Sequence, residues 1–447
     1  MKRPLLVLAV ALAAAGSASG EVVAPGVQDG MLAVGPSGVP LVAYMRGRAL
    51  EIAARSNDWR AQRAATVAAG SSLVAFAAGT RGPVAVVEGP AGRTLLLVRS
   101  RGTRWQTTEL VGRLPAGVVL GPPGVALDGR GRPLVAYTRW RHKTRESALM
   151  LARLDARGRV ETEQVTLRGF PKSYVPPPAA PVFRGGVVHV IESYGIDGAV
   201  GTIDWYPLRK TWEGQFIDGG VGDFPVGPLF AGVGRGGTIY AAWSEALLGT
   251  GELPVTLAVR PRSPAKIASD FVLDRALTTG LALTAAGPEV GANEWLSADE
   301  IGLSGDGAVW AGEVAAHGGA VQLDGWLAGL ASAPLGARDL LLAGPDGLSW
   351  FRSPRPLAIH VSIRTAEEVN GTVHVGGRVA GATGGSVVVY RERPGSPREA
   401  AGTAALAQDG SFSLDDHPPQ RPLLYRAVYV DPGTGIPYAA LLREPIR

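Results

Sequence analysis

Pairs of short apolar segments, each pair joined by a turn that contains glycine, recur along the chain. The pattern is clearest in MLAVGPSGVPLVAY from Met31, LVAFAAGTRGPVAVV from Leu73 and GVALDGRGRPLVAY from Gly124. Weaker copies begin at Pro181, Leu229 and Ile301. Because glycine adopts the positive φ angles that tight turns need, each copy predicts a β-hairpin.

The spacing of the hairpins predicts a β-propeller. The residues that follow their turn glycines are Pro40, Pro83, Pro133, Val187, Thr238 and Ala308, in steps of 43 to 70 residues. A further apolar strand follows several hairpins, and strands opened by Trp59, Trp105 and Trp212 complete the repeat. Repeats of about 40–50 residues with four strands are typical of propeller blades. We expect about six blades, with a seventh possible in LLLAGPDGLSWF from Leu340.

The chain divides into three predicted parts. Lys2 and Arg3, an apolar run and the small residues before Glu21 predict a signal peptide over residues 1–20. Residues 21–353 form the predicted propeller, and the stretch 21–27, which lacks a hairpin partner, is expected to pair with the final blade and close the ring. Residues 354–447 carry short alternating strands, which predict a β-sandwich. The expected fold class is therefore all-β.

The predicted signal peptide places the mature protein outside the cytoplasm, either secreted or in the periplasm. Its apolar run, Leu5 to Ala15, is shorter than the ~20 residues that span a bilayer. No later apolar run is long enough, so the sequence predicts no transmembrane segment.

The composition of the chain argues against disorder and against several kinds of site and partner. The 62 Gly and 34 Pro are about 21% of 447 residues, below the roughly 25–30% typical of disordered chains. With no Cys, disulfides and thiolate sites are excluded. The 39 Arg and 5 Lys are scattered among 39 acidic residues, so we do not expect a nucleic-acid partner. The six His lack the spacing of metal ligands, and we expect neither a metal nor a cofactor.

The repeat resembles the β-propellers of secreted bacterial sialidase-like proteins. ALDGRGRPLVAY, with a strand such as ALMLARL after it, carries this resemblance, and LSGDGAVW from Leu303 is similar to a degenerate Asp-box turn. The last part, with GGRVAG, DGSFSL and YRAVY, resembles the immunoglobulin-like accessory domains of secreted bacterial proteins. The resemblance implies a propeller that binds or cleaves glycans, followed by an immunoglobulin-like β-sandwich.

The predicted loops differ in length, and the long ones indicate a binding rim on the third to fifth blades. Loops between second and third strands are expected at Thr138–Ser147, around Ser193 and around Ser244. Long loops are often functional, and aromatic rings beside charged groups suit sugars. The candidate ligand-binding residues are Arg139, Trp140, Arg141, Arg145, Tyr194 and Trp243. Alternatively, Trp140 packs inside its loop and the arginines are solvated.

Two residues at the predicted loop of the fourth blade are candidates for catalysis. Glu192 could act as a general acid or base if burial raised its pKa, and Tyr194 could act as a nucleophile, as the sialidase resemblance implies. Both could equally be structural.

Three functions remain open from the sequence. The first is an exported, non-catalytic protein whose propeller rim recognises a glycan or a cell-envelope component. The second is a sialidase-like glycoside hydrolase or polysaccharide lyase, and the third is a structural envelope scaffold. The first is preferred, because the Arg-Ile-Pro segment of sialidases is absent near the N-terminus.

Overall fold

The computed structural model describes residues 20–155, 157–165, 175–194, 199–206, 211–218, 224–246, 255–260, 268–273, 276–284, 287–294, 307–311, 320–332, 336–393, 398–419 and 424–442. The elements of these residues are β-strands, apart from two short 3-10 helices, η1 (Pro90–Gly92) and η2 (Arg235–Gly237). The predicted all-β class is confirmed.

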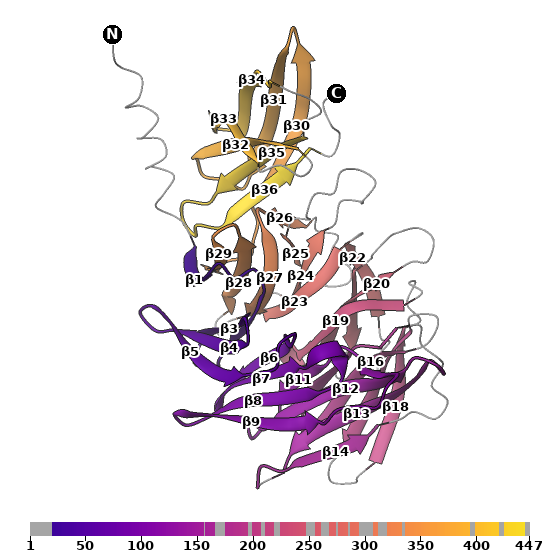
Figure 1. Ribbon diagram of the computed structural model, residues 1–447. Helices are drawn as coiled ribbons and strands as arrows, with labels where there is room; N and C mark the ends of the chain where they lie inside the picture. Colours follow the sequence, from indigo (N-terminus) through magenta and orange to yellow (C-terminus); the bar gives the residue numbers. More distant parts are fainter. Residues whose placement is uncertain are drawn as a thin grey trace.

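Antiparallel sheets of four strands are the repeating unit of the larger part of the chain (Figure 1). The first sheet contains β2 (Gly30–Val34), β3 (Pro40–Arg46), β4 (Ala49–Arg55) and β5 (Trp59–Thr66). The second contains β6 (Ser72–Gly79), β7 (Gly82–Glu88), β8 (Leu95–Arg101) and β9 (Arg104–Val111). The third is β10 (Val118–Leu120), β12 (Pro133–Arg141), β13 (Glu146–Leu154) and β14 (Val160–Gln164), with β11 (Gly124–Leu127) also paired to β12.

The later sheets repeat this order. The fourth contains β15 (Ala179–Arg184), β16 (Val187–Tyr194), β17 (Ala199–Tyr206) and β18 (Thr211–Asp218). The fifth contains β19 (Phe224–Val233), β20 (Ile239–Ala246), β21 (Val255–Arg260) and β22 (Ala268–Leu273). The sixth begins with β23 (Ala276–Thr284), β24 (Gly287–Glu294), β25 (Gly307–Ala311), β26 (Val321–Leu323), and the seventh contains β27 (Trp326–Ser332), β28 (Arg338–Gly344), β29 (Gly347–Ser353), β1 (Glu21–Pro25).

The innermost strands of these sheets contact one another in a closed order. Among the described residues, each innermost strand contacts the next one in the order β2, β6, β11, β15, β19, β23 and β27. Strand β27 in turn contacts β2, which closes the ring. This is the arrangement of a β-propeller, in which sheets stack face to face around an axis. The sheets number one more than the six hairpin landmarks. Ala308, the sixth landmark, lies in a third strand, β25, rather than after a hairpin of first and second strands.

Glycine lets the innermost strands approach one another closely. A Cβ atom on Gly124 of β11 would lie 2.7 Å from the Cα of Ala180, in β15 of the next sheet. A Cβ on Gly280 of β23 would lie 2.9 Å from the backbone nitrogen of Leu330 in β27. Since real Cβ atoms do not come this close, a side chain at either position would push two sheets apart near the axis.

The first described strand completes the seventh sheet. In β1, Glu21 pairs with Trp350 and Pro25 with Gly347 of β29, and Figure 1 shows the indigo strand beside it. The Arg55 guanidinium in the first sheet donates two hydrogen bonds of 2.6 Å to the Glu21 carboxylate. The prediction that residues 21–27 pair with the final blade is confirmed for this strand.

Buried side chains tie successive sheets together. Thr138 of β12 donates a hydrogen bond of 2.6 Å to the Pro177 carbonyl, just before β15. Between the sixth and seventh sheets, the Asn293 amide accepts from the Leu327 N–H at 2.8 Å and donates to the Leu327 carbonyl at 3.0 Å. Both side chains satisfy backbone groups that water cannot reach, and thus fix how neighbouring sheets pack.

The last part of the chain forms two antiparallel sheets. One contains β30 (His360–Val369), β31 (Thr372–Ala380) and β34 (Ser411–Asp416), and the other β33 (Glu399–Ala405), β32 (Ser386–Glu392), β35 (Leu424–Val430) and β36 (Pro437–Leu441). Buried and exposed residues alternate along β31, so this strand has one solvated face. Most of β35 is buried.

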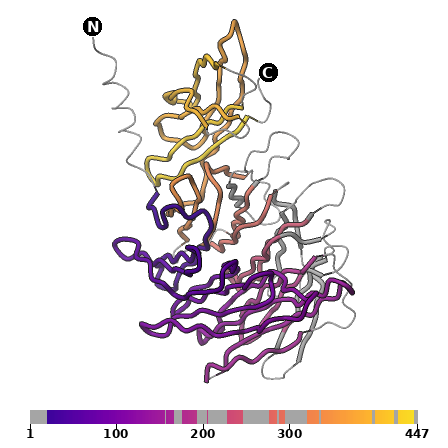
Figure 2. The backbone as a smooth tube through the Cα atoms, in the orientation of Figure 1, coloured from indigo at the N-terminus to yellow at the C-terminus, as the bar shows by residue number. Residues whose placement is uncertain are grey.

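These two sheets are continuous with the propeller. Strand β26 pairs with β36 at Leu323 and Tyr438, so the sixth propeller sheet extends into the last part of the chain. One hydrophobic cluster includes Leu323 and Leu327 together with Val389 and Tyr425. Figure 2 shows the yellow and orange tail against the segment that holds β27 to β29. The tail and the propeller therefore share a core.

Candidate functional site

The predicted rim of the third sheet is a hairpin rather than a long loop. Strand β12 runs on to Arg141 and β13 begins at Glu146, and these two residues are paired in register. Only residues 142–145 form the turn. The expectation of a long loop over Thr138–Ser147 was wrong, because strand pairing continues through the cluster of charged residues.

Trp140 is enclosed in this hairpin. Its side chain is 7% exposed, and its ring stands edge-on to the ring of His142 with centroids 5.5 Å apart. Arg139 is half-buried beside Tyr137, while Arg141 and Arg145 are exposed. The described hairpin thus presents arginines to solvent and keeps its aromatic ring inside.

Trp243 is also enclosed. It lies in β20 with no exposed surface, and its indole N–H donates a hydrogen bond of 2.6 Å to the equally buried Glu245 carboxylate. The ring packs with Ile191 and Ile239 between the fourth and fifth sheets. The loops that follow β16 and β20 lie outside the described residues.

Glu192 is a buried carboxyl group. It pairs in register with Ala179 and Gly201 and is 1% exposed, and neither of its carboxyl oxygens has a hydrogen-bond partner among the described residues. Burial raises its pKa well above the ordinary value of 4.5. Tyr194 ends the same strand, β16, and its side chain lies outside the described residues.

The seven candidates therefore do not form one exposed site in the part of the chain that the structure describes. Trp140, Glu192 and Trp243 lie near the same end of the second strands β12, β16 and β20. All three are buried.

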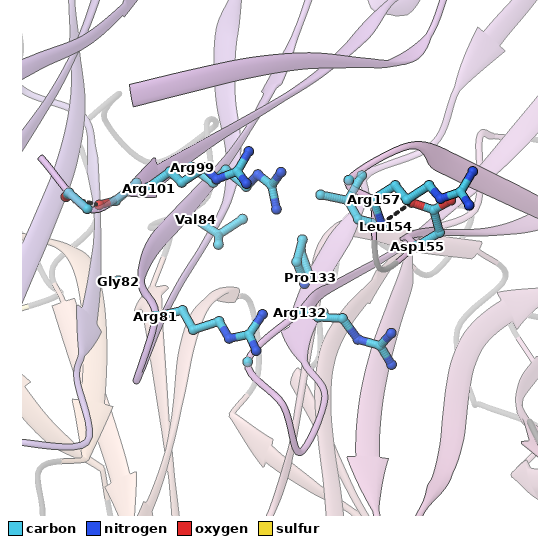
Figure 3. Close-up of a pocket in the computed structure, with 14 residues that line it drawn as sticks. Arg81, Gly82, Val84, Arg99, Arg101, Arg132, Pro133, Leu154, Asp155 and Arg157 are labelled. Carbon is cyan, nitrogen blue, oxygen red and sulfur yellow. Dashed lines mark hydrogen bonds between the residues drawn. The ribbon is translucent and has the colours of Figure 1, made fainter. Parts of the chain in front are cut away.

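A pocket lined by arginines lies between the second and third sheets, among turns that join other strands. Its volume is about 370 Å³. The charged side chains that line it are Arg81, Arg99, Arg101, Arg132, Arg157 and Asp155. In Figure 3, Arg81 and Arg132 lie below the space, and Arg99, Arg101 and Arg157 lie above it. Five guanidinium groups against one carboxylate make this pocket strongly positive.

Two turns of the third sheet are built alike and shape one side of the pocket. The sequence Asp-x-Arg-Gly-Arg occurs at 128–132 and again at 155–159. Asp128 Oδ1 accepts hydrogen bonds from the N–H groups of Arg130 and Arg132 at 2.8 and 2.9 Å, and its Oδ2 accepts from Arg132 Nε at 2.7 Å.

The second turn repeats these bonds. Asp155 Oδ1 accepts from the N–H groups of Arg157 and Arg159, both at 2.8 Å, and Oδ2 accepts from Arg159 Nε at 2.8 Å. Hydrogen bonds from the Arg159 backbone and side chain lower the Asp155 pKa below its ordinary value. In each turn the aspartate holds the side chain of the last arginine, whereas the middle arginine donates only its backbone N–H to it.

The positive charge of Arg99 is poorly compensated by its surroundings. Burial and repulsion from Arg101 and Arg81 lower its pKa. Its Nη2 donates a hydrogen bond of 2.9 Å to Gln106 Oε1, but its buried Nε has no hydrogen-bond partner in the part of the chain that the structure describes. An anion in the pocket would relieve both the repulsion and the missing hydrogen bond.

The sequence analysis does not predict this pocket, because the local pattern identifies its turns only as hairpin connections. The signal available was the repeated Asp-x-Arg-Gly-Arg pattern, since it occurs twice within the third repeat. Among the described residues there is no group of three His, Asp or Glu side chains placed to hold a metal ion. In the same residues no helix has the length and apolar character needed to cross a membrane.

The chain has distant structural similarity to known proteins. No protein-family model matches the sequence, and no curated protein matches it. The structure is similar to an α-L-arabinanase of Penicillium chrysogenum solved with arabinobiose, at a TM-score of 0.42 and 12% identity over 62% of this chain and 92% of that one.

Two further similar structures have other described activities. The SapL1 lectin, solved with α-methyl fucoside, has a TM-score of 0.38 and 12% identity over 73% of this chain and 93% of that one. A PL25 ulvan lyase has a TM-score of 0.41 and 11% identity over 59% and 76%. At these TM-scores and identities the similarity carries no argument about the function of this chain.

Proposed function

We propose that the chain is an exported, non-catalytic binding protein whose propeller recognises a glycan or another cell-envelope component. The observation that supports this is the arginine-lined pocket. Among the described residues that line it, the one carboxylate is that of Asp155, and its own turn engages both oxygens, so none of these residues offers a free carboxylate to transfer a proton or attack a substrate. A pocket of cations without a free base suits binding rather than hydrolysis.

Export rests on the signal peptide predicted over residues 1–20. Its removal would leave Glu21 close to the new N-terminus, where this residue already pairs with Arg55 and begins β1. Cleavage near Gly20 would thus remove no part of the propeller sheets.

The last part of the chain is proposed to be an immunoglobulin-like accessory domain that acts as a spacer or second contact. Its strand order supports this, since the first, second and fifth strands form one sheet and the other four form the second. Such domains pack two antiparallel sheets, often with a tyrosine at the start of the sixth strand bonded back to the preceding segment. Here the Tyr425 hydroxyl donates a hydrogen bond of 2.6 Å to Asp416.

The second candidate is a sialidase-like hydrolase or lyase, favoured by one observation. Glu192 is a buried carboxyl with a raised pKa, and such a group can act as a general acid if substrate reaches it. In the structure its carboxyl group is enclosed, and the proposal of a binding protein therefore takes precedence.

The test is a glycan array probed with purified residues 21–447, read for retention and for released product. Retention without product supports the binding protein. Product release would overturn it and direct attention to Glu192 and Tyr194. Neither retention nor release would favour the structural scaffold instead.

A further inference from the structure

Four neighbouring turns around the pocket share one design. Each carries an Arg-Gly pair, and the pairs are Arg81-Gly82, Arg101-Gly102, Arg130-Gly131 and Arg157-Gly158. All four glycines line the pocket and have positive φ angles, between 63° and 102°. Because glycine tolerates this conformation, the chain can turn back sharply at each site. Two of the turns come from the second sheet and two from the third.

The arginines of these turns are available to a ligand. Arg81, Arg101 and Arg157 are exposed, and none makes an ion pair or side-chain hydrogen bond with any residue in the described ranges. Arg99 lies deeper, half-buried between them, with its Nε unbonded. A guanidinium presents parallel N–H donors that match the two oxygens of a carboxylate, sulfate or phosphate.

We propose that this pocket, the Arg-Gly pocket, binds the oxyanion groups of an acidic polysaccharide. Arg99 contacts an oxyanion at the base, while Arg81, Arg101 and Arg157 contact the same group or its neighbours along the polymer. This inference rests on the proposed function and adds to it the location of the site and the charge of the ligand. The site lies between the second and third sheets, away from the predicted rim residues.

An acidic polysaccharide fits this pocket better than a neutral sugar does. The described residues that line the pocket include no aromatic side chain that could stack on a sugar ring, whereas five of them are arginines. The hydrogen-bond donors of the pocket are therefore suited to a negatively charged ligand. Sulfate esters and uronate carboxylates both supply the required oxygens, and the experiment distinguishes them.

The experiment uses residues 21–447 and four immobilised polymers: dextran sulfate, polygalacturonate, neutral dextran and single-stranded DNA. The test variant is the double substitution Arg81→Ala and Arg101→Ala. Both side chains are exposed and have no ion pair or side-chain hydrogen bond with the described residues, so we expect their loss to leave the fold intact. The control variant is Arg60→Ala and Arg63→Ala, which removes two exposed arginines from β5 in the first sheet. Both variants lose the same formal charge.

We expect the wild type to retain dextran sulfate, polygalacturonate or both, and not dextran. The pocket variant should bind about tenfold more weakly or worse, with a shallower salt dependence, while the control should match the wild type. Whichever acidic polymer is retained identifies the oxyanion as sulfate or carboxylate. Thermal unfolding with added sodium sulfate should show a larger stabilisation of the wild type than of the pocket variant, because sulfate stabilises folded proteins in general and the wild type alone also binds it in the pocket.

Three results would overturn the inference. Equal weakening of both variants would mean that net charge alone drives binding, and unchanged binding in the pocket variant would place the polysaccharide site elsewhere. DNA bound more tightly than either acidic polysaccharide would assign the pocket to nucleic acid. A sulfate stabilisation that is larger in the wild type than in the pocket variant, with no retention of any glycan, would instead overturn the proposed function while leaving an anion site in place.

Discussion

The buried carboxyl of Glu192 gives a prediction with a defined sign. Its pKa is raised by burial, so the folded protein holds the proton more tightly than the unfolded chain, whose pKa is near 4.5. The stability that this group contributes is fully present below the unfolded pKa and is lost as the pH rises toward the folded value. Replacing it by Gln removes the ionisation but keeps the shape and the polar group.

The magnitude follows from proton linkage. Between the two pKa values the folded state binds one proton more than the unfolded state, which changes the free energy of unfolding by about 1.4 kcal/mol per pH unit. Glu192→Gln should remove this slope. The variant should therefore gain stability over the wild type as the pH rises from 4.5, and the gain should level off above the folded pKa.

Urea unfolding of both proteins, at half-unit steps from pH 4 to 8, measures the difference directly. Other groups titrate in this range, so the quantity compared is the variant minus the wild type at each pH. Glu367→Gln, at an exposed position of β30, is the control and should show no such difference. A constant difference between Glu192→Gln and the wild type would refute the argument, because it would mean that the carboxyl does not change its affinity for protons on folding.

Three further substitutions test the packing of the propeller. Asn293→Ala leaves the N–H and carbonyl of Leu327 buried and unbonded, and should lower the free energy of unfolding in urea by about 2–4 kcal/mol; an unchanged midpoint would contradict this. Gly347→Ala puts a side chain at φ 119° and against the Ala24 carbonyl of β1, so the melting temperature should fall and β1 amides should lose hydrogen-exchange protection. Trp140→Ala should destabilise the protein by about 3–5 kcal/mol by leaving a cavity, and a variant of wild-type stability would show that the ring is not enclosed.

Much of the propeller could be predicted from local pattern. The hairpins of the first three sheets have strong apolar runs and a turn glycine, and the strands opened by Trp59 and Trp105 are outer strands as expected. The first hairpin of the sixth sheet was missed, because Ala276–Thr284 and Gly287–Glu294 contain many small and polar residues. Its weak pattern reflects close packing near the axis, which a sequence does not display.

The candidate site was harder to predict, for a physical reason. Burial of Trp140 depends on strand pairing that continues through Arg139 and Arg141, and local polarity indicated a loop there instead. The Arg-Gly pocket needs turns that are distant in sequence to meet, since Arg81 and Arg157 belong to different sheets. Such proximity follows from the order of the sheets around the ring, and no single segment encodes it.

The pairing of β1 with β29 sets the order in which the molecule can be completed. Residue 21 is made long before residue 350, yet the two lie opposite each other in one sheet. A growing chain that has not reached Ser353 therefore lacks the complete partner strand of β1 and has an unfinished seventh sheet. Contacts so distant in sequence form slowly, and open strand edges can meanwhile pair with other chains. A chain that ends before β29 is therefore expected to aggregate more readily than the complete one.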